Sequence, residues 1–346
     1  MTEPLFAAPA IAAAMSAIGI WFLRRSAAAL PSDVPNARSL HGSPVPRAGG
    51  YAIWLGFLPA AILFAPAFPG GWLGWVPAWL ALAIVSARDD ARGVAVAARL
   101  AVHALAALWS ATALALALAG AEGNDWPRLV LTTAGLALAL AWSANLYNFM
   151  DGTDGLAATM GTIGFATYAL ATLDAHAGSA GAPGSAPAFL ALAAAMLPFL
   201  AVNRPRATMF LGDVGAVPLG FLAAAFGVAG FGEGVWPAWF PLLVFLPFVA
   251  DATLTLLHRI RRRDRLWEGH RDHYYQRLAQ LGAGHRGTLA TYALLMAGAA
   301  ATALALRAAD AAAGWWALGA WCAVVGTLFA AIDYHWRKKT NIPHAR

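Results

Sequence analysis

The sequence predicts an all-α polytopic membrane protein, a bundle of about eleven transmembrane helices, and three observations support this fold class. Of the 346 residues, 60% are hydrophobic and only 12% are charged, and the mean hydropathy is +0.61. A soluble globular domain has about 45–50% apolar and about 25% charged residues. Apolar runs of about 17–25 residues, the length that crosses a bilayer as a helix, also recur along the chain. We therefore expect one integral membrane domain over residues 1–346.

The predicted spans follow one another with polar or basic segments between them. We expect the functional motifs between residues 33 and 278, followed by two further spans and a basic tail over residues 288–346. The predicted spans cover residues 5–23, 48–67, 71–88, 98–119, 128–147, 156–173, 187–202, 214–230, 237–257, 288–306 and 313–332.

The Lys and Arg residues predict the orientation of the bundle, because cytoplasmic loops carry an excess of them. With the N-terminus in the periplasm and the C-terminus in the cytoplasm, only Arg128 and Arg307 of the 23 Lys and Arg residues fall outside. Glu3 precedes the first apolar run, and Arg24 and Arg25 follow it, which is the reverse of a secretory signal. The same map puts the patterned acidic residues on the cytoplasmic face, where we expect the active site.

The stretch Asn145–Leu156 concentrates polar residues at the end of the fifth predicted span. It contains Asn148, Asp151 and Asp154, and a glycine follows each aspartate. Polar groups beside a membrane segment are costly, so by default they indicate a functional site. A plain interhelical turn is the alternative interpretation.

Asp89 and Asp90 follow the third predicted span. Adjacent carboxylates repel each other unless a cation holds them. Mg²⁺ prefers carboxylate oxygens and keeps waters and substrate phosphates in its shell. Local salt bridges to Arg88 and Arg92 are the alternative interpretation.

Two further aspartates lie at the eighth and ninth predicted spans. Asp213 precedes a helix, and a helix N-terminus would suit a metal-bound diphosphate. The alternative is that Asp213 is only the N-cap of that helix. Asp251 lies inside the ninth span and should face the bundle interior. The sequence leaves open whether Asp251 supports the site or only joins helices.

Two basic segments offer hydrogen-bond donors to phosphate groups. The first covers residues 33–50 and contains Arg47. A loop that only sets the membrane topology is its alternative interpretation. The second covers residues 259–278 and ends in residues 270–278, which we call the histidine segment and which contain His270, Arg271 and His273. Its tight spacing and lack of cysteine do not fit a zinc site. An amphipathic helix at the membrane surface is its alternative interpretation.

Together these motifs resemble the polyprenyl-phosphate N-acetylhexosamine-1-phosphate transferases of glycosyltransferase family 4. These enzymes start the O-antigen, the enterobacterial common antigen and related glycans, and phospho-N-acetylmuramoyl-pentapeptide transferase is related to them. The His-x-x-His form is closer to the O-antigen branch than to the peptidoglycan branch. The motifs that carry the resemblance are Asp33–His41 with Pro44–Gly50, Asp89–Asp90, Asn148–Ala157, Phe210–Gly215 and His270–Leu278.

The resemblance implies transfer of a sugar 1-phosphate from a UDP-N-acetylhexosamine, or its 6-deoxy form, to undecaprenyl phosphate, with release of UMP. It implies Mg²⁺, with Mn²⁺ as the alternative ion. It also implies a place in the bacterial inner membrane, contact with membrane lipid and no nucleic-acid partner, and it leaves a homodimer open. N-acetylglucosamine, N-acetylgalactosamine, N-acetylfucosamine and N-acetylquinovosamine all remain open as the sugar.

The resemblance also implies roles for individual residues. Asp213 would be the principal Mg²⁺ ligand and Asp151 a second one. Asp89, with Asp90 beside it, would lie near the acceptor phosphate, so these two and Asp213 would be catalytic. Phe210 would stack on the base, and Asp154 would lie near the uracil. The substrate-binding residues would be Asn148, Asp151, Asp154, Phe210, Arg47, His270, Arg271 and His273.

An ion-coupled membrane transporter is the competing interpretation. Buried carboxylates and a broken ninth span near Asp251 would suit cation coupling. Transporters, however, place their main polar groups near the bilayer midplane, whereas these motifs gather at one face and no inverted repeat is visible.

Overall fold

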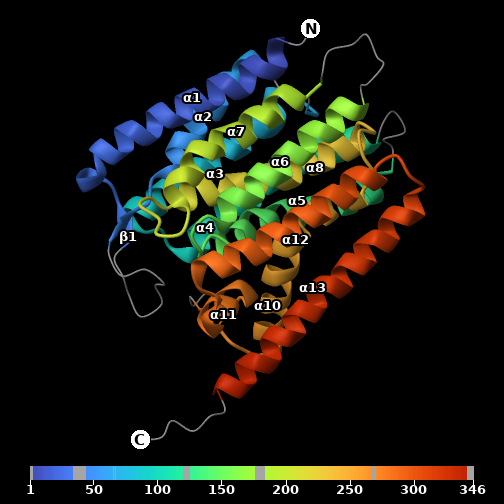
Figure 1. Cartoon of the computed structure of the whole chain (residues 1–346). Coiled ribbons are helices and arrows are strands. Elements are labelled where there is room, and N and C mark those ends of the chain that lie inside the picture. Colours follow the sequence, from blue (N-terminus) through green and yellow to red (C-terminus); the bar gives the residue numbers. More distant parts are fainter. Residues whose placement is uncertain are drawn as a thin grey trace, which may run out of the picture.

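The computed structural model describes residues 3–33, 44–64, 66, 68–119, 125–175, 184–265 and 270–340, so most of the Asp33–His41 motif lies outside the described residues. The chain forms a helical bundle with one small sheet, in which β1 (Ser32–Asp33) and β2 (Val45–Pro46) pair antiparallel (Figure 1). The helices are α1 (Glu3–Arg25), α2 (Gly49–Leu63), α3 (Trp72–Arg92), α4 (Val96–Ala119), α5 (Trp126–Phe149), α6 (Leu156–Ala175), α7 (Ala186–Asn203), α8 (Asp213–Gly232), α9 (Trp239–Val244), α10 (Leu246–Arg262), α11 (Tyr274–Leu278), α12 (Gly284–Leu306) and α13 (Ala311–Thr340), with short helical turns at Ala27–Ala29 and Ala279–Ala283.

Every predicted span falls on a helix, and the prediction of an all-α polytopic membrane protein is confirmed. In the described part of the chain, eight helices are long and apolar enough to cross a membrane. The other predicted spans fall on α2, which has 15 residues, on α3, which ends in charged residues, and on α9 with α10. Which end faces the cytoplasm stays a prediction from the Lys and Arg pattern.

The ninth predicted span is two helices rather than one. α9 ends at Val244 and α10 begins at Leu246, with Phe245 between them at φ −98° and ψ 10°. Pro247 lies in the first turn of α10, where its missing N–H removes no hydrogen bond of the helix. Asp251 therefore lies inside a regular helix, beyond the break.

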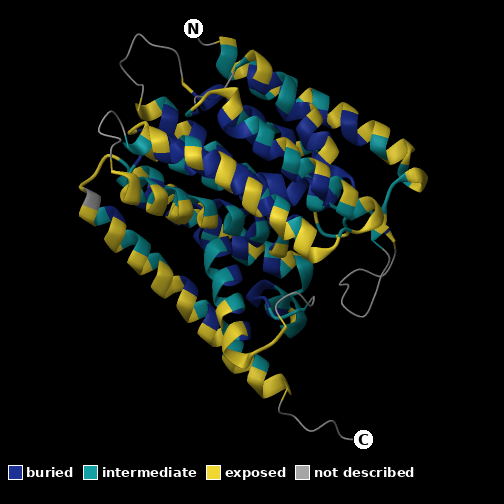
Figure 2. Ribbon diagram, turned by 180° about the vertical axis from the view of Figure 1, so that it is seen from behind, coloured by how far each residue is buried: buried dark blue, intermediate teal, exposed yellow. Residues whose placement is uncertain are grey.

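Helices α6, α7 and α8 form the buried centre of the bundle. Helix α7 packs on α1 and α6, and α8 packs on α3 and α5. Figure 2 shows buried residues gathered on the central helices and exposed residues on the outer sides of peripheral helices such as α1 and α13. Many of these exposed residues are large and apolar, for example Trp316 at 80% exposure, as expected for a surface in contact with lipid.

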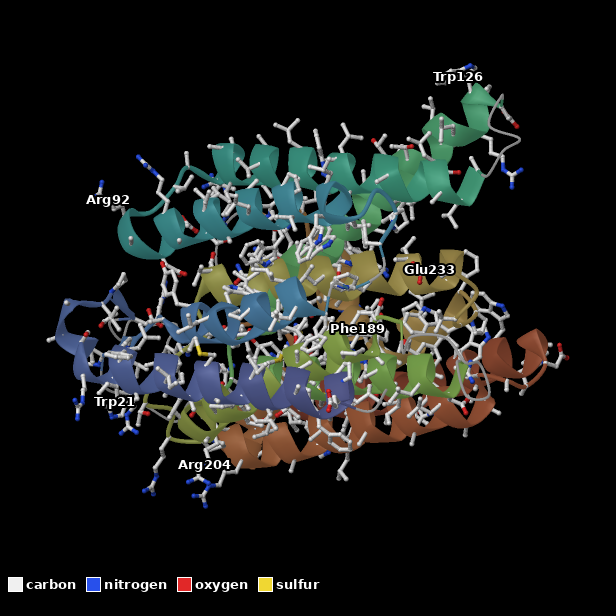
Figure 3. The ribbon with its side chains drawn as sticks, turned by 90° about the horizontal axis from the view of Figure 1, so that it is seen from above. Trp21, Arg92, Trp126, Phe189, Arg204 and Glu233 are labelled. Atoms are coloured by element: carbon white, nitrogen blue, oxygen red, sulfur yellow. The ribbon has the colours of Figure 1, made fainter. Side chains whose placement is uncertain are left out.

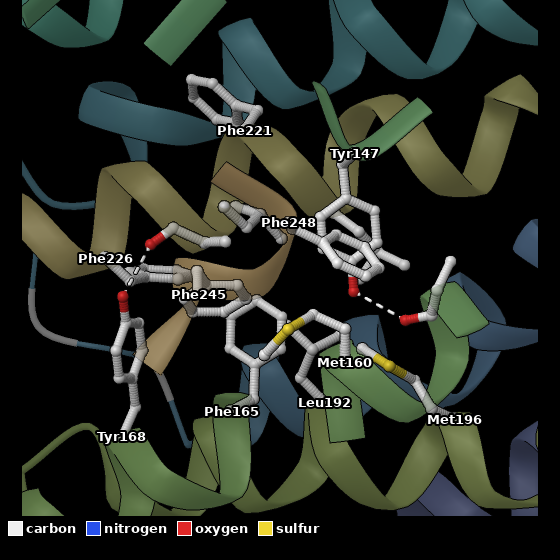
Figure 4. Close-up of a cluster of buried hydrophobic side chains, with 14 of the residues drawn as sticks. Tyr147, Met160, Phe165, Tyr168, Leu192, Met196, Phe221, Phe226, Phe245 and Phe248 are labelled. Carbon is white, nitrogen blue, oxygen red and sulfur yellow. Dashed lines mark hydrogen bonds between the residues drawn. The ribbon is translucent and has the colours of Figure 1, made fainter. Parts of the chain in front are cut away.

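Aromatic side chains fill the space between the central helices (Figure 4). The Tyr147 ring lies 5.2 Å from that of Phe248, and the Phe165 ring lies 6.0 Å from that of Tyr168. Both tyrosine hydroxyls are buried and donate to backbone carbonyls, Tyr147 to residue 157 at 2.8 Å and Tyr168 to residue 223 at 3.0 Å. Because each hydroxyl has an acceptor, the rings are buried without an unpaired polar atom.

The segments that connect the helices lie at the two ends of the bundle. Figure 3 shows Arg92 and Arg204 at one end and Trp126 and Glu233 at the other. We call the first the site end, because it carries the turns that follow α3, α5 and α7. The predicted functional motifs therefore share one end of the molecule, as the map of charged residues suggested.

Candidate active site

Asp213, the first residue of α8, lies at the site end, where side chains from α4 and α5 approach it. Its Oδ2 atom accepts a hydrogen bond from Nδ2 of Asn148 in α5 at 3.3 Å, and it lies 3.5 Å from Nη1 of Arg99 in α4. Gly212 precedes it with φ +77°, a conformation that glycine adopts without strain. The turn into α8 therefore presents the Asp213 carboxylate to side chains from two other helices.

The adjacent Asp89 and Asp90 have different partners. Asp90 accepts the backbone N–H groups of Asp213 at 3.1 Å and Val214 at 3.0 Å, so it satisfies the otherwise unpaired start of α8. Asp89 accepts a backbone N–H at 2.7 Å and forms an ion pair with Arg99. The two neighbouring carboxylates are thus held by separate sets of donors.

The start of α8 corrects the interpretation of Asp213 as the N-cap of this helix. The N-cap residue is Gly212, and the carboxylate that binds the first N–H groups of α8 comes from Asp90. Asp213 is therefore not the cap. Asp90 supplies an anion at this helix N-terminus, and a metal-bound diphosphate beside it stays a prediction.

Arg99 is the residue of this site to which the sequence analysis gave no role. It pairs with Asp89 and also reaches Asp213, whereas the alternative interpretation had paired Asp89 with the flanking Arg88 or Arg92. The signal was present in the sequence, since a charged residue at the start of an apolar helix indicates function by default.

Asp151 lies in the turn between α5 and α6 and interacts with the other acidic side chains. Desolvation, and then the charges of Asp213 and Asp90, raise the pKa of the Asp151 carboxyl well above its ordinary value. We call these residues, together with Asp89, the carboxylate cluster. Arg99 compensates only part of their negative charge, so the cluster favours an additional cation.

Asp154 holds the loop that leads into the Asp213 motif. It is 8% exposed, and its Oδ2 atom accepts the N–H groups of Arg206 at 3.0 Å and Ala207 at 3.2 Å. Its Oδ1 atom lies 3.4 Å from Nδ1 of His285. Arg206 has φ +74°, which is uncommon for a residue with a side chain. Asp154 thus stabilises this loop, and its contact with a nucleotide stays a prediction.

Backbone hydrogen bonds join the motifs that contain Arg47 and Phe210. The N–H of Phe210 donates to Pro46 at 2.8 Å, and the N–H of Gly49 donates to Phe210 at 2.9 Å. The Arg47 guanidinium pairs with Asp33 at 2.6 Å and is 38% exposed. Arg47 is therefore partly accessible to a phosphate group, and the half-buried Phe210 lies beside it.

The histidine segment lies against the end of α5. The His273 ring is 5.9 Å from that of Phe149 and 5.0 Å from that of His270. His273 is buried, whereas His270 and Arg271 are half-buried. Within the histidine segment, helix α11 has five residues and is mostly buried, so this part of the loop is not an amphipathic helix at the surface.

Helix α13 contacts the histidine segment from the other side. Nη1 of Arg277 pairs with Oδ1 of Asp333 at 2.7 Å, and the Tyr274 hydroxyl donates to Oδ2 of Asp333 at 3.2 Å. The Tyr274 ring also stacks on Phe329, with 4.0 Å between centroids. The C-terminal helix thus contributes to the framework of the site end.

The donor set of the carboxylate cluster suits a hard divalent cation. Among the described residues, no group of three or more His, Cys, Asp or Glu side chains is placed to hold a metal ion. Mg²⁺ does not need such a cage, because it binds through one or two carboxylates and completes its shell with water and substrate phosphates. Asp213 and Asp151 therefore fit an ion that is bound together with substrate.

The fold and the site define a multi-pass membrane protein with a carboxylate-rich site at one end of its helical bundle. Residues 72–231, which include the whole carboxylate cluster, match the family model described as Glycosyl transferase family 4. This match agrees with the resemblance that the motifs suggested.

The names of several similar proteins are consistent with this family match. The chain is 29% identical to a decaprenyl-phosphate N-acetylglucosaminephosphotransferase of Mycobacterium leprae, over 78% of this chain and 74% of that protein. It is 25% identical to a Bacillus subtilis protein named "Probable undecaprenyl-phosphate N-acetylglucosaminyl 1-phosphate transferase", over 73% and 71%. It is 31% identical to a phospho-N-acetylmuramoyl-pentapeptide-transferase of Picosynechococcus sp., over 57% and 53%.

Proposed function

We propose that the protein transfers an N-acetylhexosamine 1-phosphate, or its 6-deoxy form, from a UDP-sugar to undecaprenyl phosphate, and that UMP is released. One observation carries the proposal: Asp89, Asn148 and Asp213, which are far apart in the sequence, meet at one end of a membrane bundle through Arg99 and one another. The names of the relatives support a polyprenyl-phosphate acceptor. The product would start the O-antigen or another cell-surface polysaccharide.

In this reaction an oxygen of the acceptor phosphate attacks the phosphorus that bears the sugar. One O–P bond forms, the bond from this phosphorus to the UMP oxygen breaks, and UMP leaves with the bonding electrons, while the bond from the sugar to its own phosphate remains intact. The second pKa of a phosphate monoester is about 6, so the acceptor is largely ionised at neutral pH and needs no strong base. Catalysis then depends on positioning and on charge neutralisation.

We place Mg²⁺, or Mn²⁺ as the alternative, at Asp213 and Asp151. Bound there, the ion would neutralise negative charge on the phosphates. Asn148 orients Asp213, while Arg99 and Arg47 offer guanidinium donors to phosphate oxygens.

The remaining predicted site residues surround this centre. Phe210 would contact the base, and Asp154 would act at the uracil or through the loop that it holds. The diphosphate would lie between the carboxylate cluster and the histidine segment, within reach of His270, Arg271 and His273.

The partners of Asp89 favour direct attack over an aspartyl-phosphate intermediate. One of its oxygens accepts the N–H of Val94 and the other pairs with Arg99, so neither is a free nucleophile. Incubation of the protein with UDP-sugar alone tests this point. UMP release with a trapped phosphorylated protein would contradict direct attack.

The proposal is tested with purified protein, Mg²⁺, undecaprenyl phosphate and a panel of labelled UDP-N-acetylhexosamines. We expect UMP release and a lipid-linked product with at least one sugar, and loss of both with Asp213→Asn or a chelator. Asp310→Asn, at the residue just before α13, is the matched control. If no sugar in the panel gives UMP, the proposed reaction is refuted.

The transporter alternative predicts counterflow of a solute in proteoliposomes without UMP release. Asp251, the group that suggested cation coupling, lies beyond the helix break and already has donors on both carboxylate oxygens. It is therefore poorly placed to bind a transported cation.

A further inference from the structure

Asp251 is a completely buried carboxylate inside α10, a position that is costly unless its charge is compensated. The backbone N–H groups of Tyr274 and Tyr275 donate to its two oxygens, each at 2.9 Å. Nδ1 of His273 lies 3.3 Å from Oδ1. The hydroxyls of Thr255 and Tyr292 also donate to it. We call this group the Asp251 network.

Most of the network belongs to the histidine segment, so Asp251 fixes where that segment lies. Helix α11 has only five residues and could not form alone, because a short helix does not compensate the cost of its nucleation. The carboxylate satisfies its first two N–H groups, which have no partner within the helix. Figure 1 shows α11 beside α10, below the main bundle.

The contact with Asp251 also determines which side of the His273 ring remains for a ligand. Nδ1 faces the buried carboxylate, so Nε2 is the nitrogen that can meet a substrate group. The ring is held on its faces as well, since it stacks on Tyr275 at 5.7 Å and on His270 at 5.0 Å.

The histidine segment is in turn docked on the turn that carries Asp151. The Tyr275 hydroxyl donates to the carbonyl of Phe149 at 3.0 Å. A Cβ atom at Gly152 would lie only 2.1 Å from that hydroxyl, so this close approach requires glycine. The buried carboxylate and the carboxylate cluster are therefore connected through one tyrosine.

We propose that Asp251 is a positioning residue for the transfer reaction: it anchors the histidine segment against the Asp151 turn and presents Nε2 of His273 to the diphosphate of the donor. This inference rests on the proposed function and assigns Asp251 a role in it. Asp251 is completely buried, so it acts on the substrate through His273.

A double-mutant cycle tests the proposal by measuring UMP release with UDP-sugar as the varied substrate. Asp251→Asn keeps the size of the side chain but removes its charge and one acceptor. We expect kcat/KM for the donor to fall about 10- to 100-fold, the loss of one or two charge-assisted hydrogen bonds. In a His273→Ala background the same substitution should cost less than about twofold, because residues that act as a unit are not additive.

Two further variants separate positioning from folding. Tyr292→Phe removes one donor to Asp251 from α12, and we expect a smaller loss of kcat/KM that also disappears in the His273→Ala background. Thr291→Val is the matched control, since Thr291 is next to Tyr292 in α12 but its hydroxyl donates to the carbonyl of Gly287 in the same helix and not to Asp251. It should leave kcat/KM unchanged.

The outcomes distinguish the two proposals. Additive losses from Asp251→Asn and His273→Ala, or equal losses from Thr291→Val and Tyr292→Phe, would overturn the positioning role while leaving the reaction intact. If Asp251→Asn does not fold, the Tyr292→Phe cycle decides alone. Absence of UMP release from the wild-type protein would refute the reaction itself.

Discussion

The carboxylate cluster and the Asp251 network both contain buried or half-buried aspartates, with opposite electrostatic results. Asp251 is fully buried, and several donors compensate its charge. In the cluster, Asp89 and Asp213 share one guanidinium group and Asp151 repels Asp213. A compensated carboxylate indicates framework, whereas an excess of negative charge indicates where a cation belongs.

Asp213→Asn should separate the two regions most clearly. We expect kcat to fall about 10³-fold, because the substitution removes the proposed principal Mg²⁺ ligand. The free energy of unfolding should not fall, since a charge leaves a cluster with excess negative charge. Activity assays and denaturation in detergent measure the two effects. Near-normal turnover would show that the cluster is not the metal site.

Arg99→Ala should have the next largest effect. The guanidinium that lies between Asp89 and Asp213 is lost, and we expect kcat/KM to fall about 10²-fold. Arg99→Lys should recover part of the activity, because the charge remains but the planar geometry does not. If the lysine variant is as inactive as the alanine variant, geometry rather than charge dominates at this position.

Asp90→Ala should destabilise the start of α8. The N–H groups of Asp213 and Val214 would lose their acceptor, which should lower the free energy of unfolding by about 1–2 kcal/mol. Asp90→Asn keeps one acceptor, so its free energy of unfolding should lie between those of Asp90→Ala and the wild type. Equal stability of all three proteins would rule out a capping role.

Asp174→Ala should have the smallest effect. Asp174 pairs with Arg307 at the end opposite the site and is 66% exposed. Exposed pairs contribute less than about 1 kcal/mol, so stability and turnover should stay close to those of the wild type. A large loss of activity would show that the two ends of the bundle are coupled.

The architecture of this protein was readable from its sequence because each apolar run is long enough to determine a helix. A break in the ninth span was expected near Asp251, but the structure has it at Phe245, so Asp251 lies inside α10 rather than at the break. The common location of the motifs was also predictable. The distribution of Lys and Arg over the loops, combined with the number of predicted spans, places all the motifs at one end.

Individual partners in the site could not be predicted. The contact that caps α8 joins residues 123 positions apart, Asp90 and Asp213, and no local pattern announces it. Asp89 likewise takes Arg99 rather than its neighbours in the sequence. The role of Asp251 could not be predicted, because its partners in the histidine segment begin 22 residues further along the chain, at His273. Only the folded structure shows that the two are in contact.

The contact between α13 and the histidine segment has a practical consequence for work with this protein. Because Asp333 holds Arg277 and Tyr274, shortening the chain before Asp333 should inactivate it even though every recognisable motif would remain. Purification tags and reporter fusions should be placed after α13, where they leave the contacts of Asp333 with Arg277 and Tyr274 intact.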